Sequence, residues 1–316
     1  MRIVFMGTPD FAVSTLKKLI ESEHEVIAVV TQPDRPRGRG REVTPSPVKQ
    51  LATDSGIAVL QPEKAKSPEF IESFKKLAPD ITIVVAFGQI LKKEVLDTPK
   101  HFSMNLHSSL LPKYRGAAPI NWAIINGETE TGVTTMKMDE GMDTGDILLS
   151  RVVPIWDSDN SQTLHDTLKE KGASLVMETL KMLEDGTLTP LAQDASKASL
   201  APKLKKGDGL ILWEKSARSI RDHVRGLEPW PGAFSFLEQK RIRVCQAELG
   251  ESEPNDLPGT IARISDHSIE VGTGGGRLLI THLQAEGKKR MDVKSFLAGH
   301  KLESGQTFIS QTQLQS

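Results

Sequence analysis

Short apolar runs that alternate with helix-like stretches constrain the fold of this chain more than any other feature. Apolar runs occur at residues 3–6, 26–30, 81–86 and 102–106, and the first three contain β-branched residues with little polar alternation. Such runs are typical of strands buried on both faces. Apolar side chains at helical spacing occupy the stretches between them, as at residues 13–20 and 70–77. The alternation predicts a doubly wound, Rossmann-like and mainly parallel α/β sheet.

A sheet of this kind places its ligand crevice at the carboxyl ends of the strands. The first strand ends in Gly7-Thr8-Pro9-Asp10-Phe11, which lacks the glycine spacing of a dinucleotide-binding turn. We therefore do not expect a bound NAD, and a nicotinamide-dependent dehydrogenase is disfavoured.

The chain has 316 residues, more than the ~250 that one core usually holds. A polar stretch containing Pro190 and Pro202 is typical of a linker. A helical stretch at 216–225 and several short strands follow it, which indicates a small OB-like β-barrel. We expect a first domain at 1–188, a linker at 189–206 and a barrel domain at 207–316.

The composition excludes several classes of protein. Its single cysteine, Cys245, cannot form an internal disulfide or a cysteine metal cluster, so we expect a small core residue there. The longest apolar runs, such as residues 81–87, are far shorter than the ~18 residues of a membrane span. The first residues do not resemble a signal peptide. We expect a cytoplasmic protein.

Basic residues form local clusters although the net charge is only −1. The clusters that could hold a polyanion are Arg35, Arg37, Arg39 and Arg41 in a Gly- and Pro-rich segment, and Lys203, Lys205 and Lys206 near the linker. Residues 33–48 read as a long structureless loop, which in a compact domain is either functional or mobile. Guanidinium groups suit phosphates and base edges. The alternative is a solvated loop.

Two polar residues end the fourth apolar run. Asn105 and His107 are two apart on the expected strand, so their side chains point to the same face. A position at the end of a strand lets both meet a ligand in the crevice. The alternative is that they only cap the strand and form local hydrogen bonds.

A segment crowded with carboxylates and glycines lies further on, at residues 138–146. Most such runs are solvated acidic turns. The functional interpretation is that the glycine-flanked loop holds one carboxylate, Asp143, near His107.

These residues together resemble the folate-dependent formyltransferases. Asn105, His107 and Asp143 fall where that family carries its Asn-x-His … Asp set, and residues 109–112 match its Ser-Leu-Leu-Pro motif. Residues 7–12, 31–36, 115–120 and 226–233 resemble the branch that acts on tRNA. The resemblance extends to about Phe296. The chain departs from the family pattern at Glu42, Phe87, Ser108 and Leu212.

The resemblance implies transfer of a formyl group from 10-formyltetrahydrofolate to the methionine carried by initiator tRNA, without a metal and by a monomer. The Asn105 amide suits stabilisation of an oxyanion, and His107 can donate to it or relay a proton. Asp143 either orients the imidazole or holds a water. The expected folate-binding residues are Ser109, Leu110, Leu111, Pro112, Phe87 and Ile90. The two basic clusters are the expected tRNA contacts.

Two other functions share some of these features. A formyltransferase acting on a small amine would keep the three polar residues but would not need the arginine segment or the second domain. A non-catalytic RNA-binding protein on a degenerate scaffold would be free to lose Asn105, His107 and Asp143, which are all present.

Overall fold

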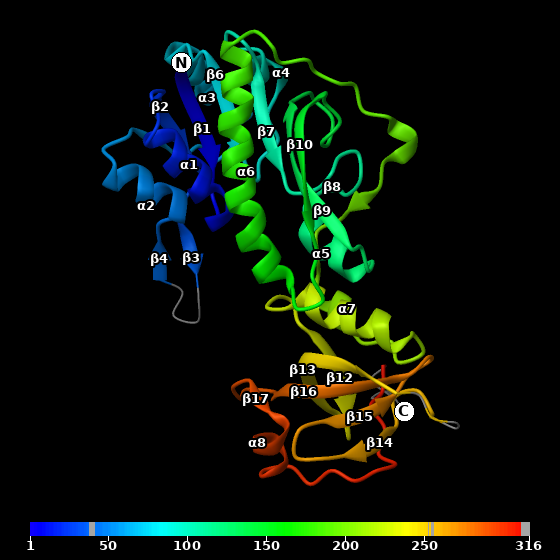
Figure 1. The fold of residues 1–316 in the computed structure, drawn as a ribbon. Coiled ribbons are helices and arrows are strands. Elements are labelled where there is room, and N and C mark those ends of the chain that lie inside the picture. The colour runs from blue at the N-terminus through cyan, green and yellow to red at the C-terminus, as the bar shows by residue number, and fades with distance from the viewer. Residues whose placement is uncertain (38–41, 252, 254–255, 311–316) are drawn as a thin grey trace. The chain divides into compact units, whose positions relative to one another are not determined.

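The computed structural model describes two compact units (Figure 1). The described residues are 1–37, 42–251, 253 and 256–310. Residues 1–119, 130–154 and 165–201 form the first unit, and residues 120–129, 155–164 and 202–316 form the second. The residues of the expected linker up to Ala201 thus belong to the first unit, and those from Pro202 to the second. The domain bounds 1–188, 189–206 and 207–316 stay predictions.

A seven-stranded, mainly parallel sheet forms the centre of the first unit, as the sequence predicts. Its strand order is β10-β9-β7-β6-β1-β2-β5, and only the pairings of β9 are antiparallel. The strands are β1 (Arg2–Gly7), β2 (Glu25–Val30), β5 (Val59–Leu60), β6 (Ile81–Val85), β7 (Ser103–His107), β9 (Glu130–Lys137) and β10 (Ile147–Pro154).

Helices cover both faces of this sheet (Figure 1). On one face, Val4, Met6 and Val84 pack against side chains of α3 (Pro68–Leu77) and α4 (Lys93–Leu96). The other face carries α6 (Ser161–Glu184). A Cβ atom at Gly172 of α6 would lie 2.7 Å from the Leu106 side chain, so the glycine permits the helix to approach β7 closely.

Capping serines set where two helices begin. The hydroxyl of Ser46 accepts a hydrogen bond from the amide of Lys49, and Ser67 does the same for Phe70. A proline follows each serine, and its fixed φ suits the first helical position. The helix that Ser46 caps is α2 (Pro47–Asp54). A further helix of this unit, α1 (Val13–Ile20), has no side-chain hydrogen bond at its N-cap.

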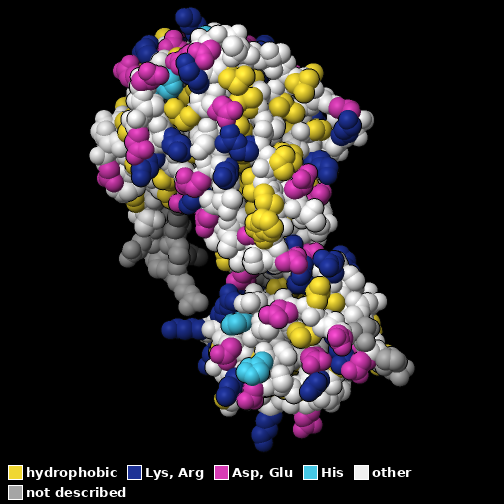
Figure 2. Space-filling view, in the orientation of Figure 1, with side chains coloured by type: hydrophobic (Ala, Val, Ile, Leu, Met, Phe, Trp, Pro, Cys, Tyr) yellow, Lys and Arg dark blue, Asp and Glu magenta, His cyan; other side chains and the backbone are white. Residues whose placement is uncertain are grey.

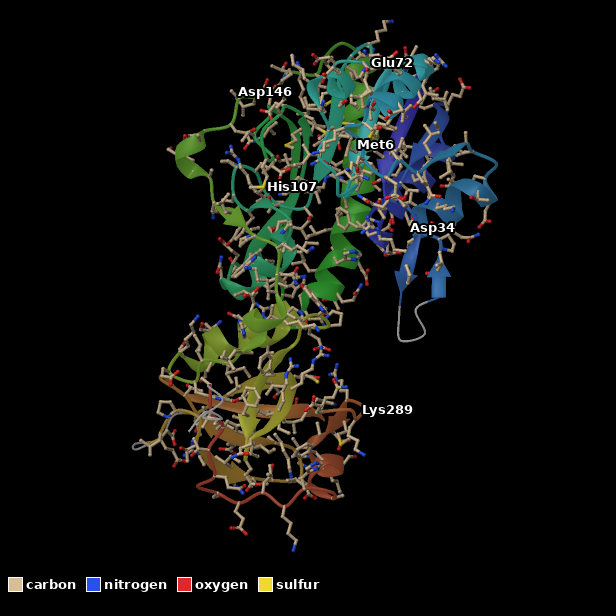
Figure 3. The ribbon with its side chains drawn as sticks, turned by 180° about the vertical axis from the view of Figure 1, so that it is seen from behind. Met6, Asp34, Glu72, His107, Asp146 and Lys289 are labelled. Atoms are coloured by element: carbon tan, nitrogen blue, oxygen red, sulfur yellow. The ribbon has the colours of Figure 1, made fainter. Side chains whose placement is uncertain are left out.

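The expectation of a structureless loop over residues 33–48 was wrong. β3 (Arg35–Arg37) and β4 (Glu42–Thr44) pair as an antiparallel hairpin. Its base is held by an ion pair between Asp34 and Lys49, and Figure 3 labels Asp34 beside the two strands. The sequence did not predict these strands, because arginine, proline and glycine give no strand signal. Backbone hydrogen bonds between β3 and β4 form the hairpin instead.

An antiparallel sheet and α7 (Ala217–Leu227) form the core of the second unit, which also includes most of α5 (Pro119–Ile125). Residues 305–309 hydrogen-bond to Gly259 and Ile261 on one side and to Phe236 on the other, which closes the sheet into a barrel. Its elements are β12 (Ala233–Leu237), β13 (Lys240–Gly250), β14 (Ile261–Ile264), β15 (Ile269–Gly272), β16 (Arg277–Ala285), β17 (Met291–Asp292) and α8 (Val293–Leu297).

Trp213 anchors the apolar core of this barrel. Its ring lies 5.6 Å from that of Phe308, and its Nε1 donates a 2.9 Å hydrogen bond to Ser235. The indole therefore buries its apolar body while its one donor is satisfied. Cys245 is buried, as expected, and burial raises the pKa of its thiol to about 11.

Acidic and basic side chains are interspersed over the visible face of each unit, consistent with the net charge of −1 (Figure 2). Among the described residues, no helix has the length and apolar character needed to cross a membrane.

Candidate functional site

The candidate site lies at the carboxyl end of β7, where the sequence analysis places it. Ser103 donates a side-chain hydrogen bond to the carbonyl of Leu96 at the end of α4. Asn105 and His107 follow at steps of two, so they share this face of the sheet. Both are buried, with 9% and 6% of their surfaces exposed. Figure 3 labels His107 at this strand end.

Hydrogen bonding defines the state of the His107 ring. Nε2 lies 2.9 Å from the backbone carbonyl oxygen of Tyr114. Because a carbonyl oxygen only accepts, Nε2 carries a proton. Nδ1 lies 3.7 Å from Oδ2 of Asp143, so this side of the ring faces a carboxylate.

Asp143 comes from the glycine-flanked loop between β9 and β10. Its backbone is left-handed, with a φ of 56°. Its Oδ2 accepts a 2.8 Å hydrogen bond from the backbone amide of Gly116. The structure therefore brings Asp143 to His107 from a segment 36 positions away in the sequence (143 minus 107).

The amide of Asn105 is available to a ligand. Among the described residues, it makes no hydrogen bond to another side chain or to the backbone. The register places Asn105 beside Val84 on β6 and beside Met136 on β9. Two buried strands thus fix its backbone, and the amide can turn its donors toward a bound oxygen.

The expected folate-binding residues differ in their exposure. Ser109 and Leu111 are buried: the Ser109 hydroxyl donates to the carbonyl of Lys113 at 2.6 Å, and the Leu111 amide donates to Thr134 at 3.3 Å. Leu110 and Pro112 are half-buried. Ile90 is 84% exposed. These residues do not form one apolar wall by themselves.

A pocket of about 600 Å³ lies at the ends of β1, β2 and β6. Phe87 lines it mainly through its backbone, because its carbonyl oxygen accepts hydrogen bonds from Thr8 and Gln32 while its ring packs in the core. Of the six residues expected at the folate, Phe87 is the one that lines this pocket. Arg35 also contributes to the lining.

The expected tRNA contacts lie in both units. Arg35 is exposed on β3 in the first unit, and Arg37 closes the described part of that strand. Arg39 and Arg41 lie outside the described residues. The exposed side chains at the start of the second unit are those of Lys203, Lys205 and Lys206.

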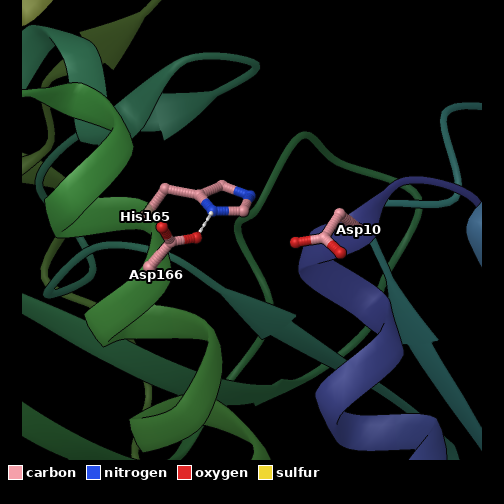
Figure 4. A group of neighbouring side chains, drawn as sticks. All are labelled: Asp10, His165 and Asp166. Carbon is pink, nitrogen blue, oxygen red and sulfur yellow. Dashed lines mark hydrogen bonds and ion pairs between the residues drawn. The ribbon is translucent and has the colours of Figure 1, made fainter.

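A second cluster of titratable groups occurs where α6 faces the end of β1 (Figure 4). Ligand atoms of Asp10, His165 and Asp166 lie within 4.8 Å of one another. The ammonium of Lys169 is 2.7 Å from Asp10 and 3.4 Å from Asp166. Since a lysine already neutralises these carboxylates, we assign no metal to the cluster.

Sequence reasoning missed several groups that hold the site. The carbonyl of Tyr114 and the amide of Gly116 are backbone groups, which no side-chain pattern reveals. Gln193 also contacts the loop of Asp143, but one glutamine in a polar stretch carries no signal in a single sequence.

Comparison with known proteins agrees with this geometry. Residues 1–180 match the family model described as "Formyl transferase", and residues 203–301 match "Formyl transferase, C-terminal domain". The chain is 52% identical over 306 residues to a protein of Geobacter sulfurreducens named methionyl-tRNA formyltransferase, covering 96% of each chain.

Solved structures share the fold at lower identity. WlaRD, a sugar 3N-formyl transferase crystallised in the presence of dTDP and 5-N-formyl-THF, superimposes with a TM-score of 0.67 at 19% identity, covering 92% of this chain and 99% of that one. HypX from Aquifex aeolicus, in complex with tetrahydrofolic acid, gives 0.64 at 22% identity. The match to HypX covers 94% of this chain and 47% of HypX, so the chain spans about half its length.

Proposed function

Because this chain belongs to the formyl transferase family, we propose that it transfers the formyl group of 10-formyltetrahydrofolate to the α-amino group of the methionine carried by initiator tRNA. The product is N-formylmethionyl-tRNA for translation initiation. The observation that carries this proposal is the 52% identity, over 96% of both chains, to a protein named methionyl-tRNA formyltransferase. The arrangement at the end of β7 supplies groups that suit the reaction.

Formyl transfer is acyl transfer between two nitrogens. The neutral amine of methionine attacks the formyl carbon, and a tetrahedral intermediate with a negatively charged oxygen forms. The bond from that carbon to the folate nitrogen then breaks. A proton leaves the attacking amine, and the folate nitrogen gains one, so the reaction is balanced without a metal or an oxidant.

Asn105 suits the oxyanion of this intermediate. Its side-chain amide is a donor with no other hydrogen bond among the described residues. Its backbone is fixed in the centre of the sheet, so little reorganisation is needed when charge develops. One such preorganised donor contributes roughly 3 kcal/mol to lowering the barrier.

His107 and Asp143 suit the movement of the proton. Since Nε2 donates to the carbonyl of Tyr114, Nδ1 is the nitrogen that gains and loses a proton during turnover. Nδ1 lies 3.7 Å from Oδ2 of Asp143, which can orient the ring. A positioned acid or base of this kind contributes about a factor of 10² to 10⁴.

The proposed function also implies where the folate and the tRNA bind. WlaRD and HypX, which share the fold, were crystallised with folates, and this supports a folate as the formyl donor. We propose that it lies beside residues 109–112, Phe87 and Ile90. Phosphates of the tRNA would meet the exposed basic residues Arg35, Lys203, Lys205 and Lys206 together with the remaining arginines of the hairpin. We place the enzyme in the cytoplasm, acting as a monomer.

The test is a comparison of acceptors. Purified protein and 10-formyltetrahydrofolate are incubated with charged initiator tRNA, with an amino-sugar nucleotide and with an aminoribonucleotide, and kcat/KM is measured for each. We expect tRNA to be preferred by several orders of magnitude. Comparable or faster formylation of either small amine would contradict the proposal and favour a small-amine formyltransferase.

A further inference from the structure

Residues 191–201, which we name the strap, connect the two loops that surround His107. At one end, Leu191 exchanges two 2.8 Å backbone hydrogen bonds with Ile147 at the start of β10. At the other end, β11 (Leu200–Ala201) pairs in parallel with β8 (Arg115–Gly116). The strap therefore contacts the segment that contains Gly116 and the strand that follows the loop of Asp143.

Gln193 of the strap joins these two loops through its side chain. Its Oε1 accepts hydrogen bonds from Nε and an Nη atom of Arg115, at 3.1 and 2.7 Å. Its Nε2 donates to the backbone carbonyl oxygens of Asp143 and Gly145, at 2.9 and 2.7 Å. One side-chain amide thus makes four hydrogen bonds, all to the loops beside the candidate site.

Only one orientation of this amide fits its surroundings. Arginine can only donate hydrogen bonds and a carbonyl oxygen can only accept them. The oxygen of Gln193 must therefore face Arg115, and the nitrogen must face the carbonyls of Asp143 and Gly145. Arg115 holds the amide in the orientation in which it can bind the loop.

The loop of Asp143 needs an external support. Asp143 has a φ of 56°, a conformation that costs a residue with a Cβ atom about 1 kcal/mol or more. A Cβ atom at Gly145 would lie 1.8 Å from the carbonyl oxygen of Lys137, so the chain returns tightly onto the end of β9. Gln193 binds the carbonyls of both residues and so holds this turn.

We propose that Gln193 is a positioning residue for the formyl transfer, acting through Asp143. By binding the carbonyl of Asp143, it keeps Oδ2 of that residue near Nδ1 of His107 and within hydrogen-bonding distance of the Gly116 amide. The inference rests on the proposed function, because it assumes that Asp143 takes part in the reaction.

Two variants separate the contacts of the amide. Gln193→Ala removes all four hydrogen bonds. Gln193→Glu is nearly isosteric and keeps the acceptor for Arg115, but it replaces the donor with an oxygen that faces two carbonyls. Both variants should lower kcat by about 10- to 100-fold, the effect expected of a small misplacement of a reacting group. The affinity for tetrahydrofolate, measured by calorimetry, should change less than about 3-fold.

The control variant is Asp194→Ala. Asp194 is the next residue of the strap, but its carboxylate bonds to Ser196 and Lys197, which both belong to the strap. This variant should keep the kcat of the parent protein. A loss as large as that of Gln193→Ala would mean that the strap is sensitive throughout, and would overturn a specific role of Gln193.

A double-mutant cycle with Asp143→Asn decides whether Gln193 acts through Asp143. Gln193→Ala should then lower kcat by less than about 3-fold in the Asp143→Asn background, because the group that it positions no longer functions. The same 10- to 100-fold loss in both backgrounds, or a parental kcat in Gln193→Glu, would overturn the positioning role. A parental kcat in Asp143→Asn alone would contradict the proposed role of Asp143, and the inference with it.

Discussion

The backbone carbonyl of Tyr114 accepts a 2.9 Å hydrogen bond from Nε2 of His107. While this hydrogen bond is intact, Nε2 keeps its proton. Nδ1, which lies 3.7 Å from Asp143, is then the nitrogen that can exchange a proton with the substrate. The proton path of the proposed reaction therefore runs on the Asp143 side of the ring. An acid or base on the Nε2 side of the ring could exchange a proton with His107 only after the hydrogen bond to Tyr114 had broken.

Substitutions of the three polar residues should lower kcat without unfolding the protein. We expect Asn105→Ala, His107→Gln and Asp143→Asn each to reduce kcat by ~10² or more, because each removes a donor or a proton carrier. The losses in double variants should be much smaller than additive, since the three residues act as one unit. Steady-state kinetics and circular dichroism check both points.

Ser108 supplies the matched control for these variants, because it is the neighbour of His107 and has no role in the proposed mechanism. Ser108→Ala should keep the kcat of the parent protein. Any of the three site variants that matches Ser108→Ala in kcat would be removed from the mechanism.

Replacement of Ile90 tests the position of the folate. Ile90 is 84% exposed, so Ile90→Ser should leave the unfolding free energy nearly unchanged. If the folate covers this side chain, the affinity for folate should fall by roughly 10- to 150-fold, since burying such a side chain is worth about 1.5–3 kcal/mol. Calorimetric titration with tetrahydrofolate measures the effect. Leu257→Ser, at a residue 66% exposed in the second unit, is the control, and equal affinities for both variants would place the folate away from Ile90.

The fold was predictable from sequence where burial leaves a periodic signal. β1, β2, β6 and β7 are largely buried, the first three contain β-branched residues, and the observed bounds of all four agree with the expected ones to within one or two residues. The β3–β4 hairpin was not predicted, because the alternation of arginine with proline and glycine at residues 35–41 gives no such signal in the sequence. Backbone pairing, which single-sequence patterns do not encode, decided that structure.

The candidate site was predictable only in part, for a similar reason. Asn105 and His107 share a strand, so a period of two places them together. The approach of Asp143 depends on a turn with a left-handed residue and on contacts from Gln193, 50 positions later in the sequence. Long-range hydrogen bonds to backbone groups leave no periodic trace.

Removal of basic side chains should weaken the binding of tRNA in proportion to the phosphates lost. We expect the Arg35/Arg37/Arg39/Arg41→Ala variant and the Lys203/Lys205/Lys206→Ala variant to flatten the plot of log K against log salt. Each lost phosphate contact should change the slope by ~0.7 to 0.9. Filter binding of charged initiator tRNA across salt concentrations gives the slope. Lys75→Ala, at an exposed lysine paired with Glu72, is the control. If the two multiple variants gave the same slope as this control, the clusters would not contact phosphates.

The second unit should lose stability in mild acid because of His223. Burial lowers the pKa of this histidine to about 4 from 6.5, so the unfolded chain binds the proton more readily than the folded one. The resulting stability is present above pH 6.5 and is lost as the pH falls toward 4, by roughly 3 kcal/mol. His223→Gln should flatten this part of the unfolding free energy plotted against pH. His267→Gln, at an exposed histidine of the same unit, should not; identical pH profiles for the two variants would contradict the assignment.

The central claim is tested most directly by the mass of the methionine recovered from initiator tRNA after incubation with the protein and 10-formyltetrahydrofolate. The proposed function predicts conversion to N-formylmethionine by the parent protein, and a rate at least ~10²-fold lower for His107→Gln. Recovery of unmodified methionine with the parent protein, or equal rates for the two proteins, would contradict it.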